Sequence, residues 1–225
     1  MSETRIRNHD WIWPLLITLV FLFVVHVAYA LSVRGGYVPA CVPYWEGCTS
    51  ISRAARHGSG NLLFRALVIP CAALHAWVWW KAARVDGIPD DGMARLVRMF
   101  GVTSAIALAV YAAFLGTQGE IYGFLRRYGV TVYFGFGFLA QLLWMRRAAR
   151  AQAVSASVLR LMRVLCAGML CLGIGNVVAG AIVDEPALRD RIENALEWQL
   201  GLLLVSWFAL LSRAWKRAGQ GPHLR

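Results

Sequence analysis

Six long apolar stretches constrain this chain more than any other feature of its sequence. They cover approximately residues 11–33, 66–80, 100–116, 130–145, 164–183 and 198–211. Only 16% of the residues are charged and 59% are hydrophobic, whereas a soluble domain needs about a quarter of charged residues. A helix of about 20 apolar residues crosses the roughly 30 Å hydrocarbon layer of a membrane. We therefore expect an all-α fold, a polytopic bundle of six transmembrane helices that forms a single domain over residues 1–225.

The first apolar stretch also has features of a secretory signal peptide, because Arg5 and Arg7 precede it. Its length exceeds the usual apolar region of about 7–15 residues. The sequence RGGYVP, at residues 34–39, is moreover a poor small-residue cleavage site. We therefore interpret residues 11–33 as a retained membrane helix.

The distribution of basic residues predicts how the helices are oriented. Of the 23 lysines and arginines, 15 fall at the chain termini and in the connections on the same side, and 8 fall on the other side. The positive-inside rule therefore places both termini in the cytoplasm and the polar connection 34–65 outside it. The formal charge of +11 is explained by this topology and by anionic lipid. The sequence has no soluble basic face, so we expect no nucleic-acid partner.

Two of the five cysteines lie outside the apolar stretches. Cys41 and Cys48 are seven residues apart in the extracytoplasmic connection, where an oxidising compartment permits a disulfide. Two free thiols are the alternative. A metal site is not expected, because the sequence has no Cys-x-x-Cys pair and no nearby His cluster.

Two apolar stretches carry small residues at every fourth position. These ridges run along residues 101–113 and 167–179. Helices associate in lipid mainly through close packing, so both ridges are predicted to contact other helices, unless they only reflect the abundance of Ala and Gly in such helices.

The polar residues outside the apolar stretches gather on the extracytoplasmic side. Guanidinium and carboxylate groups at the level of the lipid head groups could bind a phosphate or another polar group of a lipid. We predict that this ligand-binding pocket is lined by Glu46, Arg53, Glu120, Arg127, Glu197 and Trp198. The alternative is a solvated rim whose charges pair with one another.

Two other functions are compatible with the same residues. Glu46, Ser52 and His57 are candidate catalytic residues for a lipid acyltransferase or hydrolase, because a carboxylate can poise a histidine for acid–base chemistry. No Gly-x-Ser-x-Gly elbow supports a serine nucleophile.

His26 and His75 could be axial ligands of a haem in an electron carrier, although their depths in the membrane differ by roughly 4–5 Å. Whether the protein is an enzyme is left open, and no cofactor is expected.

Three short stretches resemble a known group of six-helix membrane proteins. VPYWE at 42–46 followed by SIS at 50–52 is similar to a Pro-Tyr-Ile-Ser-Asp-x-Gly loop after the first helix. Glu120 followed by residues 127–129 resembles the loop before the fourth helix, and residues 197–198 match a Glu-Trp pair at the head of the sixth. The group is the Frag/DRAM/Sfk family, which includes the damage-regulated autophagy modulators and the Cwh-type N-terminal domain.

The resemblance implies a role in lipid organisation or remodelling, with no reaction common to the family. The chain departs from the pattern at two places. Residues 45–48 replace Ile-Ser-Asp, so the acidic role would pass to Glu46. An Arg or a Tyr stands where the family commonly has a His before the fourth helix, which weakens any mechanism that needs that imidazole.

The composition also suggests where the protein resides. A chain rich in Ala and Arg is typical of a bacterial genome of high GC content, so we expect an integral protein of the bacterial inner membrane. Its expected partner is membrane lipid, and a homo-oligomer is left open.

Overall fold

The computed structural model describes residues 9–84 and 91–219, and in them it contains helices and no strands. The all-α prediction is therefore confirmed. Six of the helices are long and apolar enough to cross a membrane, as the sequence predicts. The helices in chain order are α1 (Ile12–Arg34), α2 (Pro43–Glu46), α3 (Ile51–Ala54), α4 (Gly58–Ala82), α5 (Gly92–Phe114), α6 (Glu120–Arg150), α7 (Ala156–Ile182) and α8 (Pro186–Gly219).

Most of the long helices extend beyond the apolar stretches that predicted them. The largest differences are in α6 and α8, whose apolar stretches are 130–145 and 198–211. At 1.5 Å per residue the 34 residues of α8 span about 51 Å, well above the roughly 30 Å of a hydrocarbon layer. Helices α6 and α8 are therefore longer than a hydrocarbon layer is thick, so their ends can contribute to a site at its surface.

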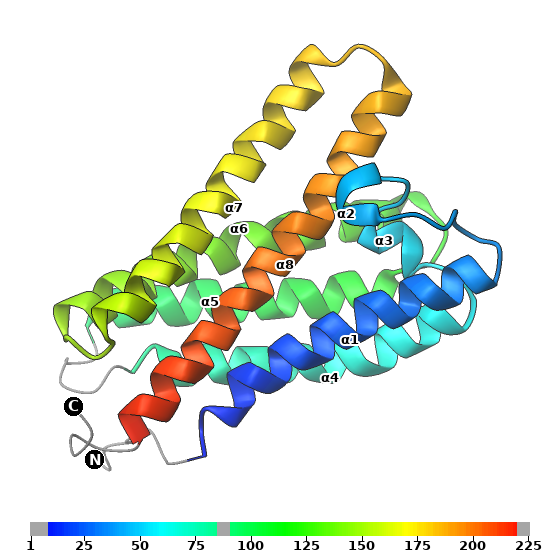
Figure 1. The fold of residues 1–225 in the computed structure, drawn as a ribbon. Coiled ribbons are helices and arrows are strands. Elements are labelled where there is room, and N and C mark those ends of the chain that lie inside the picture. The colour runs from blue at the N-terminus through cyan, green and yellow to red at the C-terminus, as the bar shows by residue number, and fades with distance from the viewer. Residues whose placement is uncertain (1–8, 85–90, 220–225) are drawn as a thin grey trace.

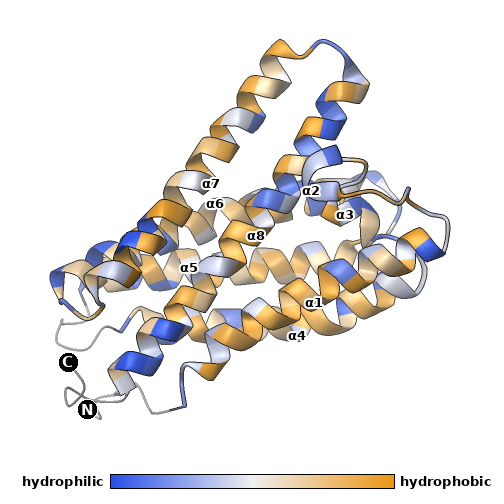
Figure 2. Cartoon of the chain, viewed as in Figure 1, coloured by the Kyte–Doolittle hydropathy of each residue, from blue (hydrophilic) through white to orange (hydrophobic). Residues whose placement is uncertain are grey.

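Successive long helices run in opposite directions, so the connections alternate between the two ends of the bundle (Figure 1). The connections 35–57, 115–119 and 183–185 lie at the same end, which we call the distal end. Helix α1 begins and α8 ends at the opposite, proximal end (Figure 1). Polar residues concentrate towards the ends of the long helices and apolar residues along their middles (Figure 2).

Helices α1, α4, α5 and α6 pack side by side, and α8 lies against both α1 and α7. Helix α7 contacts α6 much less than it contacts α8. In Figure 1, α7 and the first turns of α8 project away from the other long helices at the distal end. Helices α1, α4, α5 and α6 are therefore closely packed in that order, whereas α6 and the α7–α8 pair diverge at the distal end (Figure 1).

Aromatic rings fill the centre of the bundle. Trp79 and Trp207 are stacked with ring centroids 5.5 Å apart, and Trp144 meets Trp207 edge to face at 5.4 Å. Trp79 needs the absence of a side chain at Gly101, because a Cβ there would lie 2.2 Å from its Cγ. The small-residue ridge of α5 is therefore packed at Gly101, as the sequence predicts.

The corresponding prediction for α7 is wrong over most of its ridge. Ala167, Cys171 and Gly175 are exposed, and no atom lies within 4 Å of the position of a Cβ at Gly175. Helix α7 instead buries the face that carries Met162 and Cys166. The three exposed ridge residues point away from the other described helices, because α7 has only α8 as an extensive neighbour, and Ala179 alone of the ridge is buried.

Two ion pairs tie helix ends together at the proximal end. Lys81 at the end of α4 pairs with Asp10 before α1. The buried Arg147 of α6 pairs with Asp91, the N-cap residue of α5, whose carboxylate accepts a hydrogen bond from the backbone N–H of Ala94 at 2.9 Å. That hydrogen bond, together with the charge of Arg147, lowers the pKa of Asp91.

The lowered pKa of Asp91 predicts how stability depends on pH. A carboxyl group whose pKa is lower in the folded state stabilises the fold above its usual pKa of about 4, and this contribution is lost as pH falls through the folded value. We expect Asp91→Asn to lower the Tm of the detergent-solubilised protein at pH 7, and the difference from the wild type to shrink below about pH 4. Asp91→Ala should lower the Tm further, because alanine cannot cap the helix. A difference in Tm that is independent of pH would contradict this role for the carboxylate.

Candidate functional site

The connection between α1 and α4 is folded into a compact strap at the distal end. Cys41 and Cys48 form a disulfide, which confirms the predicted pairing. The hydroxyl of Tyr29 in α1 donates to the carbonyl of Cys41 and accepts from its N–H, both at 2.8 Å. The strap is thus closed on itself by the disulfide and attached to α1 by Tyr29.

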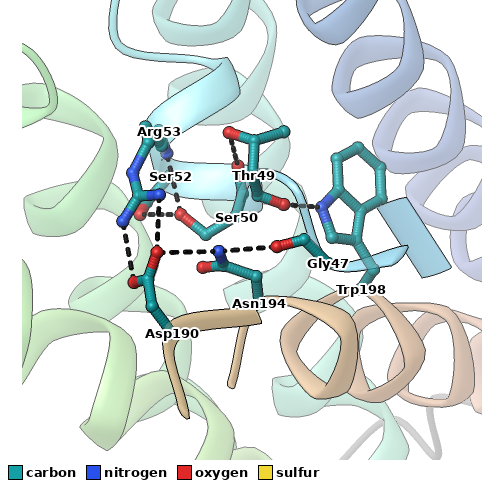
Figure 3. A network of polar contacts seen from close by, with 8 residues as sticks. All are labelled: Gly47, Thr49, Ser50, Ser52, Arg53, Asp190, Asn194 and Trp198. Carbon is teal, nitrogen blue, oxygen red and sulfur yellow. Dashed lines mark hydrogen bonds and ion pairs between the residues drawn. The ribbon is translucent and has the colours of Figure 1, made fainter. Parts of the chain in front are cut away.

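Helix α8 holds the strap through its backbone. The Asn194 amide donates to the carbonyl of Gly47 at 2.9 Å, and the Trp198 indole donates to the carbonyl of Thr49 at 2.9 Å (Figure 3). These two donors lie four residues apart, so they point from one face of the helix. Buried backbone carbonyls need such partners, because leaving one without a hydrogen bond costs about 1–3 kcal/mol.

Gly47 allows the strap and α8 to approach closely. Its φ of +60° lies in the left-handed region, and a Cβ at this position would lie 1.8 Å from the carbonyl oxygen of Arg191. A side chain is therefore excluded both by the backbone conformation and by the α8 backbone.

A bidentate ion pair joins the short helix α3 to α8. Both terminal nitrogens of Arg53 donate to the carboxylate of Asp190 at 3.0 Å (Figure 3). The hydrogen bonds to Asp190 raise the pKa of Arg53. Ser50 caps α3 by accepting from the backbone N–H of Arg53 at 3.1 Å, which fixes the start of the helix that carries this arginine.

A cavity of about 540 Å³ lies beside this junction. Residues from α3, α5, α6 and α8 and from the segment between α3 and α4 surround it. Its lining consists of Ser52, Arg56, Tyr111, Glu120, Gly123, Phe124, Arg126, Arg127, Tyr128, Val130 and Glu197. No described residue of α7 lines it, which agrees with the divergence of α7 from α6 at this end.

Glu197 is the carboxylate that joins the cavity to the strap. It accepts a hydrogen bond from the backbone N–H of Ser52 at 3.2 Å, and Arg53 and Arg56 interact with it electrostatically. The buried phenol of Tyr111 also interacts with Glu197 and Ser52. This wall of the cavity is therefore an ordered polar surface.

The arginines of the cavity differ in how they are engaged. Arg126 donates to the carbonyls of Thr117 at 2.5 Å and Phe114 at 3.3 Å, and so satisfies backbone groups where α5 ends. In contrast, no side-chain hydrogen bond or close ion pair within the described ranges engages Arg56 or Arg127. Their guanidinium groups remain available to a ligand.

The structure brings some of the predicted pocket residues together and separates others. Glu120, Arg127 and Glu197 line the cavity. Arg53 is turned towards Asp190. Glu46 lies outside the lining, where its carboxylate accepts from the backbone N–H of Val42 at 2.6 Å, and Trp198 is buried beneath Thr49.

Sequence reasoning left Tyr111, Phe124 and Tyr128 out of the predicted pocket. Tyr111 is inside an apolar stretch and carries no local signal of a site. Phe124 and Tyr128, in contrast, follow Glu120 at intervals of four residues, and this spacing places all three on one side of a helix. This four-residue spacing is the sequence signal that could have identified Phe124 and Tyr128 as residues of the pocket.

The three candidate catalytic residues are not assembled into one site. The hydroxyls of Ser52 and Ser50 are 3.0 Å apart, whereas the ring of His57 stacks on Tyr37 with centroids 5.1 Å apart. No hydrogen bond between Ser52 and His57 occurs in the described part of the chain. The carboxylate of Glu46 accepts a hydrogen bond from the backbone N–H of Val42, the N-cap residue of its own short helix α2.

The two candidate haem ligands have different surroundings. The Nε2 atom of His26 lies 3.1 Å from the hydroxyl of Tyr44, and its Nδ1 lies 2.7 Å from the carbonyl of Leu22. His75 is buried, and its Nε2 accepts from the indole of Trp79 at 2.8 Å. Neither Nε2 atom is therefore directed at a common site. Within residues 9–84 and 91–219, no group of three or more His, Cys, Asp or Glu could hold a metal ion.

In comparisons with known proteins, no family model, no curated protein and no solved structure matches the chain. The resemblance to the Frag/DRAM/Sfk family therefore stays a prediction. The site must be interpreted from its own residues.

The contact at Gly47 generates a prediction about stability. Gly47→Ala and Gly36→Ala both place an L side chain at a left-handed φ, which costs about 1–2 kcal/mol, but a Cβ at Gly36 meets nothing within 4 Å. We expect Gly47→Ala to lower the free energy of unfolding by about 1–3 kcal/mol more than Gly36→Ala, because α8 must move. Thermal unfolding of both variants measures the difference, and equal Tm values would contradict the close approach.

Proposed function

We propose that this integral membrane protein binds the head group of a membrane lipid in the distal cavity. The observation that carries the proposal is the composition of the cavity wall. It combines two arginines whose side chains make no hydrogen bond or close ion pair within the described ranges, the ordered carboxylate of Glu197 that faces one of them, and aromatic rings, at one end of a six-helix membrane bundle. Its volume of about 540 Å³ lies within the range of roughly 300–1,000 Å³ typical of small-molecule sites.

Apolar side chains exposed on a membrane-spanning helix near the cavity favour a lipid over a soluble anion. Ile174, Val177 and Val178 of α7 are 55%, 72% and 46% exposed, and α7 diverges from α6 at the distal end (Figure 1). Exposed apolar side chains at the end of a membrane bundle suit contact with acyl chains. A lipid whose head group enters the cavity would have these surfaces for its chains.

The proposal includes the orientation of the protein. We place both termini in the cytoplasm of a bacterium and the cavity on the outer side of the inner membrane. The excess of basic residues at the proximal end supports this orientation. The disulfide of the strap supports it independently, because disulfides persist in oxidising compartments.

Lipid organisation or remodelling is the role that we propose for such a site, in agreement with the resemblance to the Frag/DRAM/Sfk family. Binding alone requires only the groups that line the cavity. A hydrolytic or acyl-transfer step would require Ser52, His57 and Glu46 to act together, and their separate engagements favour binding over catalysis.

Native mass spectrometry of the purified protein tests lipid binding. We expect the wild type to retain a phospholipid and Arg127→Ala to weaken retention about tenfold or more, since one hydrogen bond to a charged group contributes roughly 1.5–3 kcal/mol. Glu197→Gln should weaken retention as well, because Glu197 faces Arg56 and orders the strap side of the cavity wall. The matched control is Arg34→Ala, which removes an exposed arginine at the same end of the bundle but away from the cavity.

Retention by Arg34→Ala together with loss by Arg127→Ala would support the site. Equal retention by the wild type and both cavity variants would contradict it. A Tm measurement on each variant separates loss of the ligand from loss of the fold, especially for Glu197→Gln, which also changes the acceptor of the Ser52 N–H.

Cysteine labelling in intact cells tests the orientation. In a Cys171→Ala background, a membrane-impermeant thiol reagent should label Ser59→Cys at the start of α4 and should not label Ala153→Cys between α6 and α7. Both positions are exposed, and lysed cells should allow labelling of both. The reverse pattern would place the termini outside and overturn the assignment.

A further inference from the structure

The charges that line the cavity have both signs. Arg56, Arg126 and Arg127 are the basic members, and Glu120 and Glu197 are the acidic ones. Glu197 is engaged by Ser52 and faced by Arg56, and Arg126 is engaged by α5. In the described ranges, Arg56, Arg127 and Glu120 make no side-chain hydrogen bond or close ion pair, so these two cations and one anion can meet a ligand, although Arg56 also faces Glu197.

One side of α6 has the composition of a site for an ammonium group. Glu120, Phe124 and Tyr128 follow one another at intervals of one turn and all line the cavity. The rings of Phe124 and Tyr128 lie with their centroids 4.2 Å apart. Aromatic faces attract ammonium groups through their quadrupoles, and a neighbouring carboxylate strengthens that attraction.

The order of these groups along α6 matches the order of charges in a zwitterionic phospholipid. Glu120 is the first residue of α6 at the distal end, and Arg127 lies seven residues further into the bundle, about 10 Å along the helix axis. In such a lipid the phosphate is attached to the glycerol, and the ammonium group is further from the acyl chains. A phosphate held by Arg127 and Arg56 would therefore place the ammonium group towards Glu120.

We propose that the cavity selects a phospholipid whose head group carries both a phosphate and an ammonium group over one that carries the phosphate alone. Arg56 and Arg127 bind the phosphate, for which guanidinium groups are well suited. Glu120 and Phe124 bind the ammonium group, and the ring of Tyr128 packs against that of Phe124. This inference rests on the proposed lipid binding and adds the chemical class of the head group to it.

A competition experiment tests the selectivity. The protein is equilibrated with equimolar dioleoyl phosphatidylethanolamine and dioleoyl phosphatidylglycerol in detergent micelles, and native mass spectrometry gives the ratio of the two bound lipids. The acyl chains are identical, so the ratio reports the head group. We expect the wild type to prefer the ethanolamine lipid roughly two- to fivefold, as one exposed cation–π contact would give.

The variants separate the two halves of the head-group site. Glu120→Gln and Phe124→Leu should bring the ratio close to one by lowering the retention of the ethanolamine lipid to that of the glycerol lipid, whose binding should not change. Both side chains are exposed, so their replacement disturbs no buried contact. Arg127→Ala should reduce the binding of both lipids. Glu185→Gln is the matched control, an exposed carboxylate at the same end of the bundle that does not line the cavity, and it should leave the ratio unchanged.

The outcomes distinguish this inference from the proposed function. Binding of both lipids with a ratio near one in the wild type, or a preference that Glu120→Gln does not alter, would overturn the selectivity and leave lipid binding intact. Absence of any bound lipid would overturn both.

Competition with glycerophosphoethanolamine, which has the same head group and no acyl chains, separates a soluble ligand from a lipid. Displacement of the bound lipid would assign the site to the soluble ester. Continued retention of the bound lipid would assign the site to the phospholipid.

Discussion

The attachment of the strap to α8 is the interaction on which the distal end of this protein depends. Between α1 and α4 the described chain has only the two short helices α2 and α3, so many of its backbone groups cannot be paired within a long helix. Asn194 and Trp198 supply donors to two of the strap carbonyls, and Gly47 lets the two backbones meet. Without these contacts, buried carbonyls would lose their partners, which is costly in a protein interior.

The cavity follows from this attachment. Because the strap is fixed against α8, α3 lies where its Ser52 N–H can donate to Glu197, and Arg56 lies in the cavity wall. Helix α6 supplies the opposite wall, and it can do so because it continues as a helix well beyond its apolar stretch. The site thus combines a strap, a long helix end and the place where α7 turns away from α6.

The two ends of the bundle use charge differently. At the proximal end, Arg147 and Lys81 are paired with Asp91 and Asp10, and these pairs join the ends of neighbouring helices. At the distal end, Arg53 is also paired, but no described residue forms an ion pair with Arg127, although both are arginines in a polar connection or helix end. Paired charges fix the fold, and an arginine directed into a cavity without a protein partner retains its capacity to bind a ligand.

The sequence by itself determined the helical class, the six spans and the polar character of one end, because these depend on composition, length and local spacing. It predicted the Cys41–Cys48 disulfide with two free thiols as the alternative, and the structure decided between them. Hydropathy requires membrane helices wherever about 20 apolar residues follow one another. Only the tertiary structure decided which polar residues meet. Glu46 and Glu120 are equivalent as sequence signals, yet one binds its own short helix and the other lines the cavity. The reason is physical: the direction of a side chain depends on how the strap docks on α8 and on how far α6 extends, and both are set by contacts between residues distant in the chain.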